Sequence, residues 1–496
     1  MQLTNLPNEI LAEIAHHTLP QGFENFKATC KHTHEICAPL TKRHNYMCEH
    51  AYFSSKGQSA FTLIDRITAT PILGRYIEYA YLRKVSLLRV GHDGTRLPED
   101  YTESEQVLIK TLFAKSSFLK EVGLDWEKYY AQISSEMCHH RLAVPERRSY
   151  GYSQHAFMFL LTLLPNLKVL ELPTFWHPTT SDQKPIETMV DRARQIHPHR
   201  QPILSNLSDI IFEGLSEYMS TAPYSLPDDK LVDLVLVTPF LALPNLRHFR
   251  YSDCIAYDYS QSISKYLPDG FESSLESLHL TNANVSATSI SQILKHTPHL
   301  KIMHYNHRYH SSDRPEFGLW PFIQAVESEV GAHLEELSLS VVTLALPLPT
   351  PRFGEWKQPA RSLCNLHGFK KLQRLELPQQ MPIYKSYNEY ESRIIEESIL
   401  SDMVPPSVSR LSVRGNLMFE EDEKFYRAKV DIIFGDFASQ KDLHFSALEG
   451  IALVETVNNP RTILDLEKLG VKVWKFLDHL SPINWTEEEH FRDENW

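Results

Sequence analysis

The chain has 496 residues, of which 42 % are hydrophobic and 11 % aromatic, so it has the composition of a folded protein and exceeds the size of one compact core. Its formal net charge of −12 argues against non-specific nucleic-acid binding, which needs a basic surface. No signal-like segment opens the chain, no apolar run approaches the ~18 residues of a membrane span, and six scattered cysteines fit free thiols, so we expect a cytoplasmic or nuclear protein that binds no membrane.

The first element that the sequence predicts is a short amphipathic helix at the amino end. Asn5 can cap it, and Pro7 suits a first turn, where no amide donor is needed. Four apolar residues then recur at helical spacing and form one narrow stripe: Leu6, Ile10, Leu11 and Ile14.

A second amphipathic run is expected from Phe23 to Ile36, with Phe26 and Cys30 on the same face as Phe23. About forty residues cannot bury enough apolar surface to be stable alone, so the exposed part of the stripe should bind a partner. Laying it into a groove of another helical protein is a common recognition mode. The alternative is an ordinary helix that caps a larger domain.

The order of residues in this segment resembles the F-box, a module that docks substrate receptors onto the Skp adaptor of cullin-RING ubiquitin ligases. The resemblance rests on Leu6-Pro7-Asn8-Glu9-Ile10-Leu11-Ala12-Glu13-Ile14, Phe23, Phe26, Cys30-Lys31 and Pro39-Leu40-Thr41-Lys42-Arg43-His44. The end of the segment is most similar to F-box proteins of filamentous fungi. The resemblance implies an F-box over residues 1–48 that binds the adaptor, and through it a cullin, by way of Leu6, Pro7, Ile10, Leu11 and Ile14.

Residues 49–75 are expected to form a helical linker that ends near Pro71. The aromatic and β-branched segment from Arg75 to Leu88 predicts a first strand, and residues 91–100 a loop.

From there to residue 482, helical stretches alternate with short strands of a recurring form. The clearest copies share a Pro-Asn/His-Leu-Lys/Arg lead-in, which ends a helix and starts a strand at a fixed offset, and they cover residues 164–172, 243–251 and 297–305. Related segments cover 274–280, 333–339 and 371–377, and weaker ones 207–212, 408–413 and 448–453.

These segments resemble the strand of leucine-rich repeats. The resemblance predicts an α/β protein in which a short all-α F-box is followed by a curved, irregular solenoid with a parallel strand wall. Uneven spacing predicts insertions near residues 173–202 and 378–406, the second with a helical run from Ile394 to Leu400. Residues 483–496 read as an acidic tail. Strand–helix alternation also builds doubly wound sheets, which remains the alternative fold.

Side chains alternate faces along a strand, so the residue between the last two apolar positions of each repeat should point outward on the wall. Those residues are Glu171, Ile211, Arg250, His279, His304, Ser338, Glu376, Ser412 and Ala452. Arg250, His279 and His304, with His248 beside them, predict a basic stripe that would seat an acidic or phosphorylated segment of a target protein. The alternative is that these are ordinary solvated positions.

A cluster of cysteines and histidines between residues 30 and 50 does not match a zinc spacing, and its members fit core positions of the first helices better. No phosphate-binding, nucleophile-elbow or zinc-protease motif occurs, so we expect no cofactor, no metal and no catalysis. The sequence therefore favours the substrate-recognition subunit of an SCF-type ubiquitin ligase. A non-catalytic repeat scaffold outside any ligase is the alternative, and an enzyme with an unrecognised site in the insertions is a more distant third.

Overall fold

The chain forms two compact units in the computed structural model, one of residues 1–212 with 243–245 and one of residues 213–242 with 246–496. The residues that the structure describes are 3–54, 59–81, 100–142, 153–173, 176, 178–195, 203–212, 231–256, 263, 267, 270–309, 318–343, 361, 364–379, 381–388, 393–414, 429–435, 437–454 and 460–476. The predicted acidic tail at 483–496 and the loop at 91–99 lie outside these ranges.

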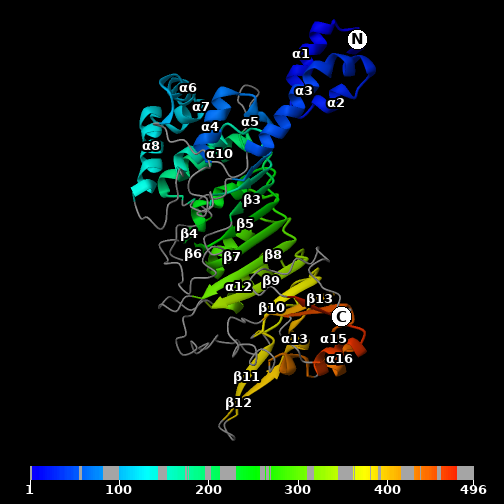
Figure 1. Ribbon diagram of the computed structural model, residues 1–496. Coiled ribbons are helices and arrows are strands. Elements are labelled where there is room, and N and C mark those ends of the chain that lie inside the picture. Colours follow the sequence, from blue (N-terminus) through cyan, green and yellow to red (C-terminus); the bar gives the residue numbers. More distant parts are fainter. Residues whose placement is uncertain are drawn as a thin grey trace. The chain divides into compact units, whose positions relative to one another are not determined.

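The first unit is mainly helical. After a 3-10 turn at Leu3–Asn5, its helices are α1 (Asn8–Thr18), α2 (Phe23–Lys27), α3 (Lys31–Ser54), α4 (Ala60–Ala69), α5 (Leu73–Tyr76), α6 (Glu103–Ala114), α7 (Ser117–Val122), α8 (Trp126–Leu142), α9 (Gln154–Leu161) and α10 (Thr180–Arg194) (Figure 1). The helices expected before residue 75 are therefore present, but α3 runs without interruption through residue 48, the predicted end of the F-box. Three parallel strands complete the unit: β1 (Tyr79–Tyr81), β2 (Val169–Glu171) and β3 (Asp209–Phe212).

The second unit is built on a parallel ladder of eight strands. In their order across the sheet these are β5 (His248–Ser252), β7 (Ser277–Val285), β8 (Ile302–Tyr309), β9 (Glu336–Thr343), β10 (Arg374–Pro378), β13 (Arg410–Arg414), β14 (Gly450–Val454) and β15 (Lys472–Phe476) (Figure 1). Two short strands, β4 (Val232–Asp233) and β6 (Cys254–Ala256), extend the unit in parallel beside β7. All nine predicted repeat segments are strands, and the eleven strands of the two ladders are all parallel, consistent with a leucine-rich-repeat-like solenoid.

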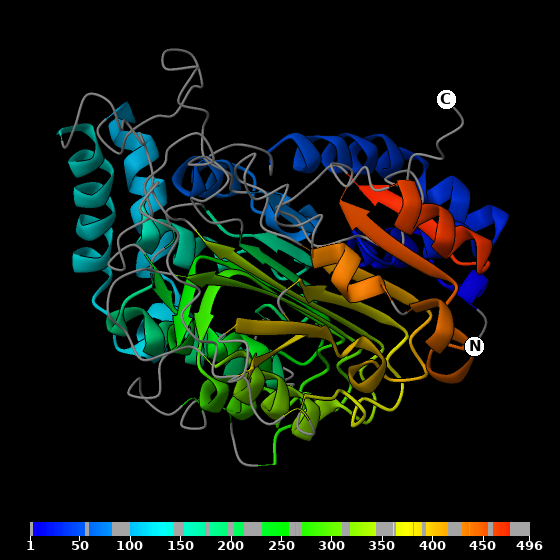
Figure 2. The same ribbon diagram turned by 90° about the horizontal axis from the view of Figure 1, so that it is seen from below.

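Helices of the second unit return the chain from one strand to the next. They are α11 (Ala287–Leu294), α12 (Leu319–Val330), α13 (Leu400–Met403), α15 (Phe437–His444) and α16 (Pro460–Lys468), with 3-10 turns at Leu234–Leu236 and Thr238–Ala242. Figure 2 shows the green helices of this unit on one side of the strands. Apolar faces of α11 and α12, such as Ile290, Ile293, Phe322 and Val326, are buried, as expected where helices cover one face of a sheet.

The Pro-Asn lead-in has a structural reason. The Asn166 side-chain amide donates to the carbonyl oxygen of Arg75 at 2.7 Å, and that of Asn245 donates to the carbonyl oxygen of Ser205 at 2.6 Å. Asn206 makes the same contact with Pro165 at 3.2 Å. Each asparagine thus joins the start of one repeat to the backbone of the repeat before it, which satisfies a carbonyl group that the turn leaves without a ladder partner.

The apolar positions of the repeats form a continuous core. The first leucine of the strand pattern, as in Leu167, Leu300 and Leu372, is fully buried, and so are the two that follow it on most strands. A Leu→Ala change at such a site lowers the free energy of unfolding by about 2–5 kcal/mol. The buried leucines of each rung therefore contribute strongly to the stability of the repeat array.

Two predictions in the repeat domain are wrong. The segment from Ile394 to Leu400 was expected to be helical, but β12 (Arg393–Ser398) pairs antiparallel with β11 (Ile383–Asn388), and only the short α13 follows. Pairing of two β-rich segments overrides a weak helical period. The predicted first strand is shorter than expected, because Arg75 and Tyr76 belong to α5 and only Tyr79–Tyr81 of the described residues is extended. No helix of the described ranges is long and apolar enough to cross a membrane.

Candidate functional site

Helix α1 carries two different apolar surfaces. Leu11 and Ala15, one turn apart, are fully buried where α1 contacts α2 and α3. Ile10 is 48 % exposed, and Ile14, four residues on, is half-buried on the same helix face. Leu6 is half-buried and Pro7 exposed just before the helix.

The N-terminal stripe is therefore Leu6, Pro7, Ile10 and Ile14. The expectation that Leu11 shares this surface is wrong, because Leu11 is 0 % exposed. Its side chain is buried on the side of α1 that contacts α2 and α3 and is not part of the exposed stripe. An apolar side chain as exposed as Ile10, beside two half-buried ones, is a surface that a partner groove can cover.

The start of α1 differs from the prediction. Pro7 itself is the N-cap, with φ −55° and ψ 147°, and its carbonyl oxygen accepts from the amides of Ile10 and Leu11, both at 3.1 Å. Asn5 lies in the preceding 3-10 turn and does not cap the helix. Proline disfavours a helical conformation for the residue before it, so Leu6 stays outside the helix, which begins at Asn8.

The run from Phe23 to Ile36 is also not one helix. It is interrupted between Lys27 and Lys31, where Cys30 N donates to Thr33 Oγ1 at 3.1 Å and Thr33 Oγ1 donates to the Cys30 carbonyl oxygen at 2.8 Å. A threonine that bonds the backbone locally competes with helix continuation and favours a new start. The break turns α3 back against α1 and α2.

A buried histidine ties these helices to the next element. His44 Nδ1 lies 3.0 Å from the hydroxyl of Tyr76 in α5, and its ring lies 4.8 Å from that of Phe23 in α2. Burial lowers the pKa of His44 and raises that of Tyr76 to about 12, so both are neutral near pH 7. These contacts pack α3 against α2 and α5, and α1, which carries the stripe, packs in turn against α2 and α3.

The cysteines and histidines between residues 30 and 50 do not converge on a metal. Cys37 and His44 are buried, whereas Cys48 is exposed, and no group of three His, Cys, Asp or Glu side chains within the described ranges could hold a metal ion. These residues serve as packing and hydrogen-bonding groups of α3.

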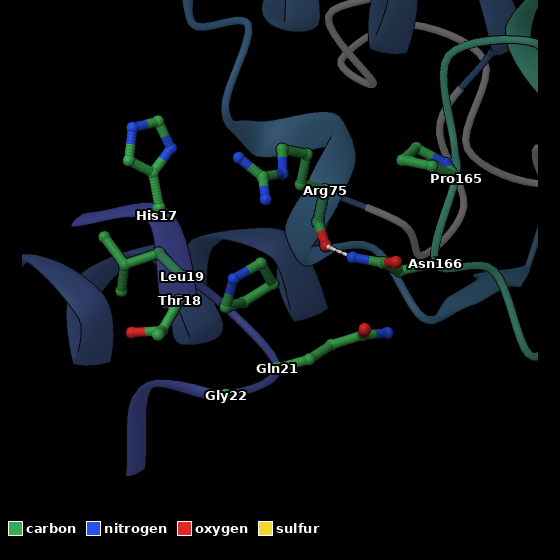
Figure 3. Close-up of a pocket in the computed structure, with 9 residues that line it drawn as sticks. His17, Thr18, Leu19, Gln21, Gly22, Arg75, Pro165 and Asn166 are labelled. Carbon is green, nitrogen blue, oxygen red and sulfur yellow. Dashed lines mark hydrogen bonds between the residues drawn. The ribbon is translucent and has the colours of Figure 1, made fainter. Parts of the chain in front are cut away.

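A groove opens between the α1–α2 turn and the first repeat of the same unit (Figure 3). His17 and Arg75 line one part of it, and Asn166 lies across from them with its side-chain amide on the Arg75 carbonyl oxygen. Both basic side chains are exposed, as on an ordinary surface, and we assign no ligand to this groove.

The second candidate site is the polar face of the strand wall. In the second unit, the predicted outward residues pair in register from rung to rung: Arg250 with His279, His279 with His304, His304 with Ser338, Ser338 with Glu376, Glu376 with Ser412 and Ser412 with Ala452. In the first unit Glu171 pairs with Ile211. The predicted alignment of these positions is confirmed.

The predicted basic stripe is only partly realised. His248 and Arg250 are exposed, but His279 is half-buried and His304 is buried. The two imidazole rings lie 4.1 Å apart. Burial, followed by the charges of His304 and Arg250, lowers the pKa of His279 to about 2, so this ring is neutral at pH 7.

His304 is also not available to a bound target protein, because its side chain is buried. Its Nε2 lies 2.5 Å from Glu336 Oε1, and Arg374 Nε lies 2.6 Å from Glu336 Oε2. One buried carboxylate is thus shared by two basic side chains. The predicted stripe is not a row of exposed cations, because His279 is half-buried beside Ser277 and His304 is buried against Glu336.

A second buried carboxylate, on the next rung, also contacts an arginine. Glu376 Oε1 lies 2.7 Å from Arg414 Nε, and Glu376 Oε2 accepts from Ser338 Oγ at 2.8 Å. Glu376 is 0 % and Arg414 4 % exposed. Together with the Glu336 contacts, this buried network locks the rungs β8 to β13 to one another.

Sequence reasoning named three residues of this network, His304, Ser338 and Glu376, and missed the other three. Glu336 and Arg374 stand two positions before the predicted outward residues Ser338 and Glu376, and Arg414 stands two positions after Ser412. Period-two alternation places them on the same face, so that period applied in both directions would have found them. It would not have found β15, whose segment lacks the Pro-Asn-Leu lead-in and alternates only from Val471 to Val473.

No protein-family model matches this chain, and no curated protein matches its sequence.

Proposed function

We propose that the protein is the substrate-recognition subunit of an SCF-type ubiquitin ligase. In this proposal Leu6, Pro7, Ile10 and Ile14 dock a Skp adaptor, which connects the chain to a cullin, while the strand wall binds a target protein. The chain performs no bond-making step. It raises the effective concentration of the target beside the ubiquitin-conjugating enzyme, a contribution of proximity and orientation.

The observation that carries the proposal is the exposure of Ile10 on a helix whose Leu11 and Ala15 are fully buried. Ile10 is 48 % exposed while Leu11, the next residue, is 0 % exposed. Fully burying an isoleucine is worth about 1.5–3 kcal/mol, so the stripe would gain substantially by entering a groove. Combined with the F-box order of residues from Leu6 to His44, this favours a docking role over a simple helical cap.

Co-expression with a Skp adaptor tests the proposal. The wild-type chain is expected to co-purify with the adaptor as a stable complex, and Ile10→Asp is expected to abolish that complex, because a carboxylate in an apolar groove lacks a partner. Leu464→Asp is the matched control, since Leu464 is a similarly exposed leucine (52 %) on α16, outside the F-box. Circular dichroism of each variant confirms that it is folded.

A wild-type protein that stays monodisperse and ignores the adaptor would favour the non-catalytic scaffold. In that case the N-terminal helices serve as a cap of the repeat array, as repeat proteins need at their ends.

The exposed residues His248 and Arg250 remain candidates for contact with the target protein. His279 adds no positive charge to them, because its ring is neutral at pH 7. Arg250→Glu tests it: unchanged capture of a target identified by affinity purification would exclude a role for Arg250.

A further inference from the structure

The last rungs of the strand wall gather cations in one register row. Arg374 pairs with Arg410, Arg410 with Gly450, and Gly450 with Lys472. Neighbouring rungs lie ~5 Å apart, so these cations fall within ~15 Å along the row. The same row contains one described carboxylate, Glu336, which His304 and Arg374 already share.

The gap at Gly450 is filled by an aromatic ring. The six-membered ring of Trp474 occupies the place where a Cβ on Gly450 would stand. Only glycine therefore lets the indole lie against the wall at this rung. Trp474 belongs to β15 two residues after Lys472, and its side chain leans back along the strand over the row of cations.

Two cations are held around this one ring. The Arg410 guanidinium carbon lies 5.6 Å and Lys472 Nζ 5.5 Å from a ring centroid of Trp474, within the range of cation–π attraction. Arg410 and Trp474 are half-buried and Lys472 is exposed, so solvent reaches the group. The indole thereby positions two like charges that would otherwise repel each other and spread apart.

We infer that Arg410 and Lys472, positioned by Trp474 over Gly450, form the contact site for an acidic segment of the target protein. This rests on the proposed use of the strand wall for target binding. A chain of net charge −12 repels acidic peptides at long range, so binding one requires a local concentration of cations such as this row. Two cations around one ring fit the two oxygens of a carboxylate or phosphate group.

The test uses the full-length chain without adaptor and three labelled peptides. One alternates glutamate and serine, the second is the same peptide phosphorylated on serine, and the third alternates lysine and serine as a control of opposite charge. Fluorescence anisotropy at about 50 mM salt, where the Debye length exceeds 10 Å, measures binding. The acidic peptides are expected to bind and the lysine peptide not. Whichever acidic peptide binds more tightly shows whether carboxylates or phosphates are preferred.

Variants then locate the site. Arg410→Gln with Lys472→Gln is expected to weaken binding about tenfold or more, because it removes both charges. Gly450→Ala keeps every charge but displaces the indole, and should weaken binding about three- to tenfold. Lys301→Gln is the control, an exposed cation of the same unit that pairs with Glu276 outside the row, and should leave binding unchanged.

If Gly450→Ala does not fold, Trp474→Leu and Trp474→Phe replace it. Loss of binding with leucine and its recovery with phenylalanine, at equal thermal stability, marks a positioning role of the ring. No binding of either acidic peptide up to about 1 mM, or equal loss in Lys301→Gln, would overturn the inference. Adaptor co-purification of the same variants is independent of this result, so failure of the F-box proposal and failure of the acidic-segment site can be told apart.

Discussion

The buried pair of Glu376 and Arg414 gives the sharpest test of the strand wall. The carboxylate is fully buried and the arginine nearly so, and the two are 2.7 Å apart. Removing one member of such a pair typically costs about 3–5 kcal/mol, because the remaining charge stays in a low-dielectric site. Glu376→Leu also leaves the Ser338 hydroxyl without its acceptor, which adds about 1–3 kcal/mol.

We therefore expect Glu376→Leu and Arg414→Met each to destabilise the second unit by at least 3 kcal/mol on that scale, roughly 6 °C or more in the unfolding temperature. The double variant should cost less than either single change, since an apolar pair replaces an ionic one. Hydrogen exchange of peptides that cover β10 and β13 measures the effect where it occurs.

The control is the exposed ion pair of Arg361 and Glu397, 3.0 Å apart on the same unit with both side chains about half exposed. Its loss through Glu397→Leu should cost less than ~1 kcal/mol. If Glu376→Leu and Arg414→Met cost no more than this control, water screens the pair, and the inference of a buried ionic network on the wall is refuted.

Two further predictions concern the first unit. Leu11→Ala should lower the free energy of unfolding by about 2–5 kcal/mol in urea denaturation. Ile10→Ala should change it by less than ~0.5 kcal/mol and weaken adaptor binding instead. Equal effects on stability would contradict the assignment of Leu11 to a buried face and Ile10 to an exposed face of α1. His155 Nδ1 lies 2.6 Å from Glu136 Oε1, and although burial opposes both charges, hydrogen bonding raises the pKa of His155 above 6.5 and lowers that of Glu136 below 4.5. The stabilisation by His155 is complete below pH 6.5 and lost as pH rises through its raised pKa, and that by Glu136 is complete above pH 4.5 and lost as pH falls through its lowered pKa. The difference in unfolding temperature between wild type and Glu136→Gln should therefore be greatest between pH 4.5 and 6.5, and a pH-independent difference would exclude this account.

The sequence by itself determined the rungs of the wall and their register. Leucines at fixed spacing must all be buried, and a strand with period two then sends the residues between them to the opposite face, as the aligned Arg250, His279 and His304 demonstrate. The Pro-Asn lead-in likewise marks the starts of β2 and β5, because its asparagine bonds the backbone of the repeat before it.

Only the tertiary structure decided which of these residues are available to a partner. The sequence cannot show that Leu11 faces α3 while Ile10 faces outward, since both fit one helical stripe. Nor can it show that Glu336 contacts both His304 and Arg374, or that the ring of Trp474 lies over Gly450, because these contacts join rungs separated by tens of residues. Burial and ionic pairing depend on neighbours in space. For that reason the basic residues in the sequence predicted a charged surface, whereas in the folded wall the His279 ring is neutral and His304 is paired with Glu336.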